Sequence, residues 1–446
     1  MRKLERRSVI CLLLAAVLFL GLSLFIFRFV TKGGQWATFY ANTQIYTNGM
    51  INRGTISDRN DTLLMDCSKD GISYNSDWTT RVATVHAVGD PKGNVATGAI
   101  NVFKSQLIGY DLLNGTYETS KEGKKIKLTI DADANVTAYN ALGGRTGTVG
   151  VMNWKTGEIV CMVSTPSFDP AGKLSKDTDS SYYFNNLIMG TMTPGSTFKL
   201  VTSAAVIDNY EDRNNFSFTC DGVNKFKDIK FTDVETHGTV DFHEALAKSC
   251  NGAFGRLTRE VGASTMRKYV KKLGLTKPIK INGVESAAGS FDFPKDDPVK
   301  LSWAGIGQAD DQVNPCAMMV YMGAIANEGV AVQPTLIKSA TFLKNITGGK
   351  SAGRYLDKGT ANELRSMMKN NVKSNYGEGN YPGLDLYAKS GTAEVGDRSD
   401  SWFVGFIDNE NNPYAFVVWV KSGGFGSSTA GPIARSVLNK LISNGE

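Results

Sequence analysis

The sequence has little of what metal enzymes and disulfide-bonded domains usually contain. Its 446 residues include three histidines, His86, His237 and His243, whose spacing matches no metal-ligand pattern, which argues against a metal hydrolase. The six cysteines form no CxxC pair, so the sequence predicts neither a zinc site nor a legible disulfide framework. We therefore expect no metal and no cofactor. One or two disulfides, or a host that lives without oxygen, both remain compatible with the cysteines.

Positive charge is too scarce for a nucleic-acid-binding protein. The net charge is +6, and half of it lies in the first seven residues. No basic block with interleaved aromatic residues follows, so we expect no nucleic acid partner. We find no internal repeat and no low-complexity segment. The length is sufficient for two or three domains.

The N-terminus contains a long apolar run. Residues 8–27 carry no charge and, as a helix, would span roughly 30 Å, the thickness of a bilayer core. Basic residues precede the run, so the positive-inside rule places residues 1–7 in the cytoplasm and exports the chain after the anchor, residues 8–30. A cleaved signal peptide would need a shorter apolar core and a small-x-small cleavage site, which are absent here. We expect a single-pass protein of the cell membrane with its catalytic domain outside.

The rest of the chain predicts an α+β fold. A mixed polar region, residues 31–127, precedes a larger domain, residues 128–446. In the larger domain, β-rich runs near both ends predict a five-stranded antiparallel sheet flanked by helices, because short turns join neighbouring runs. The predicted strands are 147–154, 159–164, 386–394, 402–407 and 414–421. The predicted helices are 132–142, 196–209, 242–248, 252–260, 315–327 and a last one that starts at Pro432.

Ser196 opens one of these helices. Proline and glycine precede it and a strongly apolar run follows, which is typical of a helix start. Lys199 lies three residues later, on the same helix face. A serine hydroxyl is a weak nucleophile until a neighbour takes its proton, and lysine can do so only when burial or another cation makes it neutral. Alone the pattern is weak, since a helix cap and a solvated lysine also explain it, and Ser366 with Lys369 repeats it.

Ser249 and Asn251 lie at a short junction between two predicted helices. Side chains two residues apart on such a junction can point into one cleft. Capping of the following helix is a competing explanation. Ser73 and Asn75 repeat the pattern in the N-terminal region, where we expect no helix after them.

Lys389, Ser390, Gly391 and Thr392 lie on a predicted strand. Alternation places Lys389 and Gly391 on one face and the two hydroxyls on the other, unless twist at an edge exposes both. Glycine lets another backbone or a ligand approach closely. A cation and two hydroxyls on an edge strand could bind a carboxylate, although an ordinary edge strand with a solvated lysine explains the run equally well.

The order Ser-x-x-Lys, Ser-x-Asn, Lys-Ser-Gly resembles that of penicillin-binding proteins and β-lactamases. The resemblance covers nearly everything after the anchor. It includes the run from Arg53 to Asn60, which is similar to a class B pedestal motif, although from its residues alone a salt-bridged surface loop is favoured. Too few residues precede the larger domain for the glycosyltransferase of class A members. The chain thus resembles class B proteins with a short pedestal, residues 31–127, of the penicillin-binding protein A type.

The resemblance implies a role for each matching residue. Ser196 would attack the penultimate D-Ala carbonyl of a peptidoglycan stem peptide, with Lys199 as base and Ser249 as proton relay. The remaining matches would supply charge or bind substrate: Lys389 through its charge, Asn251 at the peptide backbone, and Ser390, Gly391 and Thr392 at the terminal carboxylate. Penicillin would acylate the same serine. Because class B members lack a polymerase, a membrane-embedded glycosyltransferase of the SEDS family is an implied partner. A role in division, elongation or sporulation stays open.

Several other functions compete with this one. The segment from Ser196 to Lys199 also matches class D β-lactamases and their sensor relatives, which usually have Ser-x-Val where this chain has Ser249 and Asn251, and which lack a pedestal. A D,D-carboxypeptidase would share the three motifs and use water as acceptor. An inactive penicillin-binding scaffold would not need intact motifs. A Ser-His-Asp hydrolase would need Gly-x-Ser-x-Gly, which is absent around Ser196.

Overall fold

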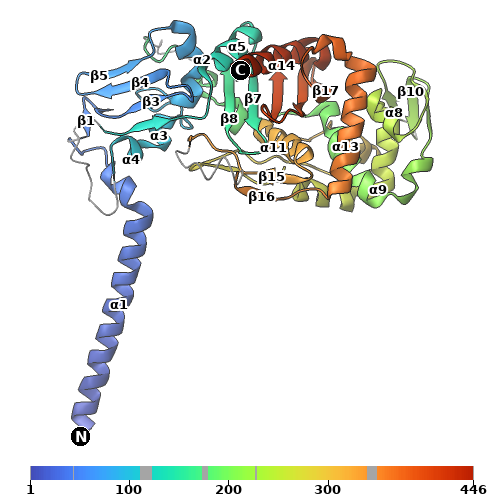
Figure 1. Ribbon diagram of the computed structural model, residues 1–446. Helices are drawn as coiled ribbons and strands as arrows, with labels where there is room; N and C mark the ends of the chain where they lie inside the picture. The colour runs from blue at the N-terminus through green and yellow to red at the C-terminus, as the bar shows by residue number, and fades with distance from the viewer. Residues whose placement is uncertain are drawn as a thin grey trace.

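A long apolar helix, α1 (Arg2–Ala37), projects from the body of the protein (Figure 1). Within the part of the chain that the computed structural model describes, it alone is long and apolar enough to cross a membrane. It includes the predicted anchor and extends beyond it to contact α4 (Lys104–Leu107) with its last turns. The described residues are 2–43, 45–110, 123–172, 179–226, 229–338 and 349–444.

A four-stranded sheet follows α1, in the order β5-β4-β3-β6 (Figure 1). All neighbours are antiparallel except β3 and β6, which are parallel. The expectation of no helix after Ser73 and Asn75 is wrong, because Asp77 caps α2 by accepting from the Thr80 N–H. The elements of this part are β1 (Tyr46–Thr47), β2 (Met50–Ile51), β3 (Thr55–Ser57), β4 (Leu63–Ser68), β5 (Gly71–Tyr74), α2 (Trp78–Val88), α3 (Ala99–Val102) and β6 (Lys125–Lys127).

The second sheet has five antiparallel strands in the order β17-β18-β19-β7-β8, which confirms the prediction. Its inner strands are apolar on both faces. Along β19, Ala415 and Val417 belong to one hydrophobic core, which includes α11, and Phe416 and Val418 to another, which includes α14. The sheet therefore lies between two layers of helices. The strands are β7 (Gly147–Asn153), β8 (Ile159–Thr165), β17 (Leu386–Val395), β18 (Arg398–Ile407) and β19 (Tyr414–Val420).

Most of the helices lie between β8 and β17 in sequence, as predicted. They are α6 (Asn186–Met189), α7 (Lys199–Asn209), α8 (Phe242–Ala247), α9 (Asn251–Lys272), α10 (Pro298–Ala304), α11 (Pro315–Ala326) and α13 (Lys358–Asn371). α5 (Ala132–Leu142) and α14 (Gly426–Ser443) flank them in sequence and pack on each other. The short strands among them are β9 (Phe218–Cys220), β10 (Val223–Phe226), β11 (Ile229–Thr232), β12 (Gly238–Val240), β13 (Lys280–Ile281), β14 (Val284–Glu285), β15 (Val330–Val332) and β16 (Ser351–Arg354).

Two helices differ from the prediction in length. α9 continues past residue 260 because Gly262, at φ 78°, kinks the helix without ending it. The last helix starts at Gly426, so Pro432 lies inside it and the predicted start is wrong. Its first turn packs so tightly that a Cβ at Gly426 would lie 2.2 Å from the Trp402 carbonyl oxygen. Tertiary packing thus holds a glycine- and serine-rich turn that has low helix propensity.

The run from Arg53 to Asn60 joins the two sheets. Asp58 is 1% exposed. Its Oδ2 accepts from the Ala132 N–H at 3.0 Å, and its Oδ1 accepts from the N–H groups of Asn60 and Thr62, each at 2.8 Å. The interpretation as a surface loop is therefore wrong at Asp58, which is a buried acceptor for backbone groups of both parts.

We expect Asp58→Asn to lower the free energy of unfolding by about 2 kcal/mol, because the amide N–H₂ would face the Ala132 N–H and leave buried donors unpaired. Asp61→Asn is the matched control, since Asp61 is exposed and forms ion pairs only with Lys125 and Lys127 within the described residues. Calorimetry of the full-length protein in detergent measures the difference in Tm. Equal Tm values for the two variants would contradict this role of Asp58.

Candidate active site

Ser196 lies on a short 3-10 turn, Gly195–Phe198, that leads into α7. Lys199 is the first residue of α7, and its Nζ lies 3.1 Å from Ser196 Oγ. Ser196 is half-buried, whereas Lys199 is fully buried. The predicted sharing of one helix face is confirmed, and Lys199 is not a solvated lysine.

The junction between α8 and α9 brings Ser249 and Asn251 to Lys199. Lys199 Nζ donates to the Ser249 carbonyl oxygen at 2.5 Å, to Ser249 Oγ at 3.1 Å and to Asn251 Oδ1 at 2.8 Å. Ser249 reaches this position with a left-handed backbone, φ 56°. The competing explanation fails, since it is the Cys250 sulfur that caps α9 by accepting from the Ala253 N–H.

Lys389 completes a chain of polar atoms. It is 1% exposed, and its Nζ donates to Ser249 Oγ at 3.0 Å. Ser196, Lys199, Ser249 and Lys389 therefore form a continuous path of hydrogen bonds along which a proton can move. Three chain segments far apart in sequence supply this path.

Both lysines have depressed pKa values. Burial lowers the pKa of Lys199 to about 8, although the Asp233 carboxylate opposes this change. Burial lowers the pKa of Lys389 well below its usual range, and the charge of Lys199 acts in the same direction. Lys199 can therefore be neutral near physiological pH, as a general base must be.

Strand β17 lies close against the turn that carries Ser196. A Cβ on Gly391 would lie 2.9 Å from Thr197 Cγ2 and 3.0 Å from the Pro194 carbonyl oxygen. A Cβ on Gly195, where φ is 54°, would lie 2.8 Å from the Thr392 carbonyl oxygen. The predicted close approach at Gly391 is thus an approach of the nucleophile's own backbone.

Ser390 is held by a residue that the sequence analysis missed. Tyr376 donates from its hydroxyl to Ser390 Oγ at 2.9 Å and accepts from the Ser390 N–H at 2.7 Å. Asn371 donates to the same hydroxyl at 2.9 Å. β17 is an edge strand, so these groups satisfy a backbone N–H that no strand pairs. No motif marks Tyr376 in the sequence, because only the fold brings it to β17.

A cleft of about 470 Å³ surrounds these groups. The predicted residues that line it are Ser196, Ser249, Asn251, Lys389, Ser390 and Thr392. The repeated pattern at Ser366 and Lys369 lies elsewhere, where Lys369 forms ion pairs with Asp385 at 2.6 Å and Glu378 at 3.4 Å. Half-buried serine, buried lysines and edge-strand hydroxyls in one cleft are suited to nucleophilic acyl transfer.

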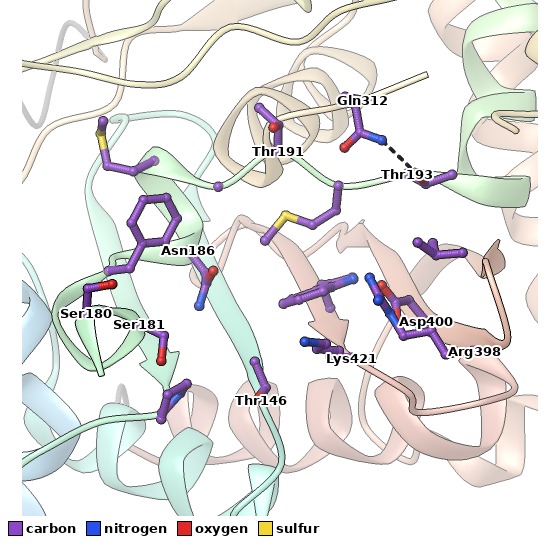
Figure 2. Close-up of a pocket in the computed structure, with 17 residues that line it drawn as sticks. Thr146, Ser180, Ser181, Asn186, Thr191, Thr193, Gln312, Arg398, Asp400 and Lys421 are labelled. Carbon is purple, nitrogen blue, oxygen red and sulfur yellow. Dashed lines mark hydrogen bonds and ion pairs between the residues drawn. The ribbon is translucent and has the colours of Figure 1, made fainter. Parts of the chain in front are cut away.

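Figure 2 shows a second cavity, of about 570 Å³, beside the segment that leads to the nucleophile. Gln312 donates to Thr193 Oγ1 at 3.0 Å and holds this segment. Successive residues of β18 alternate between the cavities, since Ser399 lines the cleft and Arg398 and Asp400 line the second cavity. The start of β18 thus separates the two spaces.

Comparison with known proteins agrees with this geometry. The family model described as the penicillin binding protein transpeptidase domain matches residues 147–439. The chain is 27% identical over 391 residues to the peptidoglycan D,D-transpeptidase PbpA of Mycolicibacterium smegmatis, covering 78% of each chain. It is 26% identical over 462 residues to PbpA of Mycobacterium tuberculosis, covering 93% of this chain and 88% of the relative.

Solved structures share the fold. A penicillin G acyl-enzyme complex of penicillin-binding protein A from M. tuberculosis matches with a TM-score of 0.74 at 24% identity, over 88% of this chain and 99% of that one. A D,D-transpeptidase domain from Eggerthella lenta matches with a TM-score of 0.73 at 24% identity, over 88% and 98% of the two chains.

We expect the rate of acylation by a fluorescent penicillin to rise with pH through about 8, because only neutral Lys199 can accept the Ser196 proton. Lys199→Arg keeps the charge and cannot lose its proton, so the rate should fall by about 10² to 10⁴. Lys369→Arg is the control and should leave the profile unchanged. A flat wild-type profile, or full activity of the Lys199 variant, would refute the assignment of the base.

We expect Tyr376→Phe to slow acylation about tenfold, since the Ser390 N–H and hydroxyl lose their partner. Tyr381→Phe is a matched control, because both tyrosine rings contact the Phe403 ring, at centroid distances of 5.3 Å for Tyr376 and 5.9 Å for Tyr381. Stopped-flow labelling gives the rates. If both variants react at the wild-type rate, Tyr376 does not position Ser390.

Proposed function

Because this chain belongs to the penicillin-binding protein transpeptidase family, we propose that Ser196 forms the acyl-enzyme of its D,D-transpeptidase reaction on peptidoglycan stem peptides. The protein is a class B penicillin-binding protein of the PbpA type, a serine enzyme that penicillin inhibits. The observation that carries the assignment is the path from Ser196 through Lys199 and Ser249 to Lys389 inside one cleft.

The first half-reaction forms the acyl-enzyme. Neutral Lys199 accepts the Ser196 proton, Ser196 Oγ bonds to the penultimate D-Ala carbonyl carbon, and the peptide bond to the terminal D-Ala breaks. Ser249 passes the proton from Lys199 to the leaving amine. The backbone N–H groups of Ser196 and Thr392 form the oxyanion hole, with each donor contributing about 3 kcal/mol.

The remaining residues bind the donor peptide. Asn251 contacts its backbone amide, and Lys389 supplies positive potential beside Ser249. Ser390 and Thr392 hold the terminal carboxylate on the edge strand, where Gly391 permits the close approach to the Ser196 turn. In the second half-reaction, an acceptor amine attacks the ester, returns a proton to Ser196 and forms the cross-link.

The anchor and the domain boundaries follow from the same proposal. Residues 1–7 form a cytoplasmic tail, residues 8–30 cross the cell membrane, residues 31–127 form the pedestal and residues 128–446 the transpeptidase domain. The exposed apolar α1 and the basic residues before it support this topology, which places the cleft outside the membrane with its substrate. A SEDS-family glycosyltransferase is the proposed partner, since a class B enzyme cross-links strands that another enzyme polymerises.

We expect a fluorescent penicillin to label the wild type and Ser366→Ala, and not Ser196→Ala. Ser366→Ala is the matched control, because Ser366 belongs to the second Ser-x-x-Lys pattern of the chain. With a stem-peptide donor and an acceptor amine, mass spectrometry should detect one D-Ala released for each cross-linked product.

Three outcomes would overturn parts of this proposal. Labelling of Ser196→Ala would refute the nucleophile. Rapid hydrolysis of penicillin without a trapped adduct would show a β-lactamase. Release of D-Ala with only the hydrolysed peptide, in the presence of acceptor, would show a carboxypeptidase.

A further inference from the structure

Four potential metal ligands from separate positions in the sequence gather beside the active site. They are Cys220, Asp233, His237 and Cys250, and their ligand atoms all lie within 4.8 Å of one another. Both cysteines are fully buried, and Asp233 is half-buried. Nothing in the acyl-transfer mechanism uses the sulfur or imidazole groups of this cluster.

The fold explains how the cluster forms. Cys220 ends β9 and pairs with Gly238 of β12, so His237, which precedes β12, lies next to it. Asp233 follows β11, and Cys250 is the residue at the N-terminal cap of α9. No sequence spacing typical of zinc sites results, because the ligands come from three strand ends and a helix cap.

The distances fit the edges of a tetrahedron. Zinc binds sulfur at about 2.3 Å and nitrogen or oxygen at about 2.0 to 2.1 Å, which places a sulfur about 3.5 Å from an adjacent nitrogen or oxygen ligand. Here Cys220 Sγ lies 3.3 Å from Asp233 Oδ2 and 3.4 Å from His237 Nδ1. Cys250 Sγ lies 3.5 Å from the same Asp233 oxygen.

We propose that Cys220, Asp233, His237 and Cys250 bind one zinc ion. Two thiolates, an imidazole and a carboxylate in a tetrahedral arrangement are ligands that favour zinc over calcium or magnesium. Four protein ligands close the coordination sphere, as in structural rather than catalytic zinc sites. Binding releases the protons of the two thiols to solvent, and the ion takes no part in the acyl transfer.

The site lies directly behind the junction that holds two catalytic groups. Cys250 stands between Ser249 and Asn251, whose side chains contact Lys199. Asp233 Oδ1 accepts from the Asn251 N–H at 2.6 Å, and the Thr232 carbonyl oxygen accepts from Asn251 Nδ2 at 2.9 Å. The ion therefore ties the Thr232–Asp233 segment to this junction and keeps Ser249 in its left-handed conformation.

Two other states would place the same atoms together. The thiols could donate hydrogen bonds to Asp233 without any metal, because the observed distances also suit such bonds. Alternatively, Cys220 and Cys250 could form a disulfide, although both thiols are free in this structure. The experiment has to separate these states.

The first measurement uses the wild-type, full-length protein purified in detergent with reductant and without oxygen. Elemental analysis should find about one zinc per chain. After chelation and addition of Co²⁺, the absorption spectrum should show thiolate-to-cobalt charge transfer and the intense visible bands of tetrahedral cobalt. Zinc addition should raise the Tm of the chelated protein by several degrees, because the ion binds only the folded state.

Variants locate the ion. Cys220→Ser and His237→Ala should reduce the zinc content from about one ion per chain to less than a tenth of that and remove the cobalt bands. Cys316→Ser and His243→Ala are the matched controls, since neither residue belongs to the cluster, and they should keep both. His237→Ala should also slow acylation of Ser196 about tenfold or more, while the wild type regains its rate when zinc is restored.

Three results would overturn the proposal. One is a wild-type protein that holds no zinc and takes up neither zinc nor cobalt while both thiols react freely, which would show hydrogen bonds alone. The second is a Cys220–Cys250 disulfide, detected by mass spectrometry after alkylation at lysis. The third is full metal content in both cluster variants. These readouts do not depend on transpeptidase activity, so failure of this site and failure of the proposed function are distinguishable.

Discussion

The buried Lys199 is the constraint on which the active site depends. A cation without hydrogen-bond partners in a protein interior is costly, so the fold has to surround its amine with oxygen atoms. Ser196, Ser249 and Asn251 supply them from two segments. The same burial lowers the pKa of Lys199 to about 8. One physical condition therefore assembles the catalytic side chains and prepares the base.

Close packing between backbones imposes the second constraint. The turn before Ser196 lies against β17 on one side and against Gly307 on the other, where a Cβ would lie 2.3 Å from the Gly195 carbonyl oxygen. Side chains at Gly195, Gly307 or Gly391 would separate these segments. The glycines thus set the distance between the nucleophile and the strand that carries Lys389 and the two hydroxyls.

The supports of the site extend well beyond the three motifs. Tyr376 holds Ser390 on an unpaired strand edge, and Asp233 holds the backbone of Asn251. Further away, Asp58 joins the N-terminal sheet to the start of α5 by accepting from backbone groups of both parts. Each of these supports satisfies backbone N–H groups whose partners are lost if the support is removed.

The sequence by itself determined the local elements and their chemistry. Apolar periodicity predicted the five strands and most helices, and the uncharged run from residue 8 to 27 predicted the helix that α1 forms. Motif order identified Ser196, Lys199, Ser249 and Lys389. These signals were readable because helix and strand periods, and spacings within one element, are local properties of the chain.

Only the tertiary structure decided which of the repeated patterns is an active site. Lys199 and Lys369 follow a serine at the same spacing, and long-range packing buries the first and leaves the second in surface ion pairs. Tyr376, the early start of α14 and the cluster around Cys220 and Cys250 carry no local signal either. Burial, pKa and ligand geometry depend on residues that are distant in sequence, so they exist only once the chain has folded.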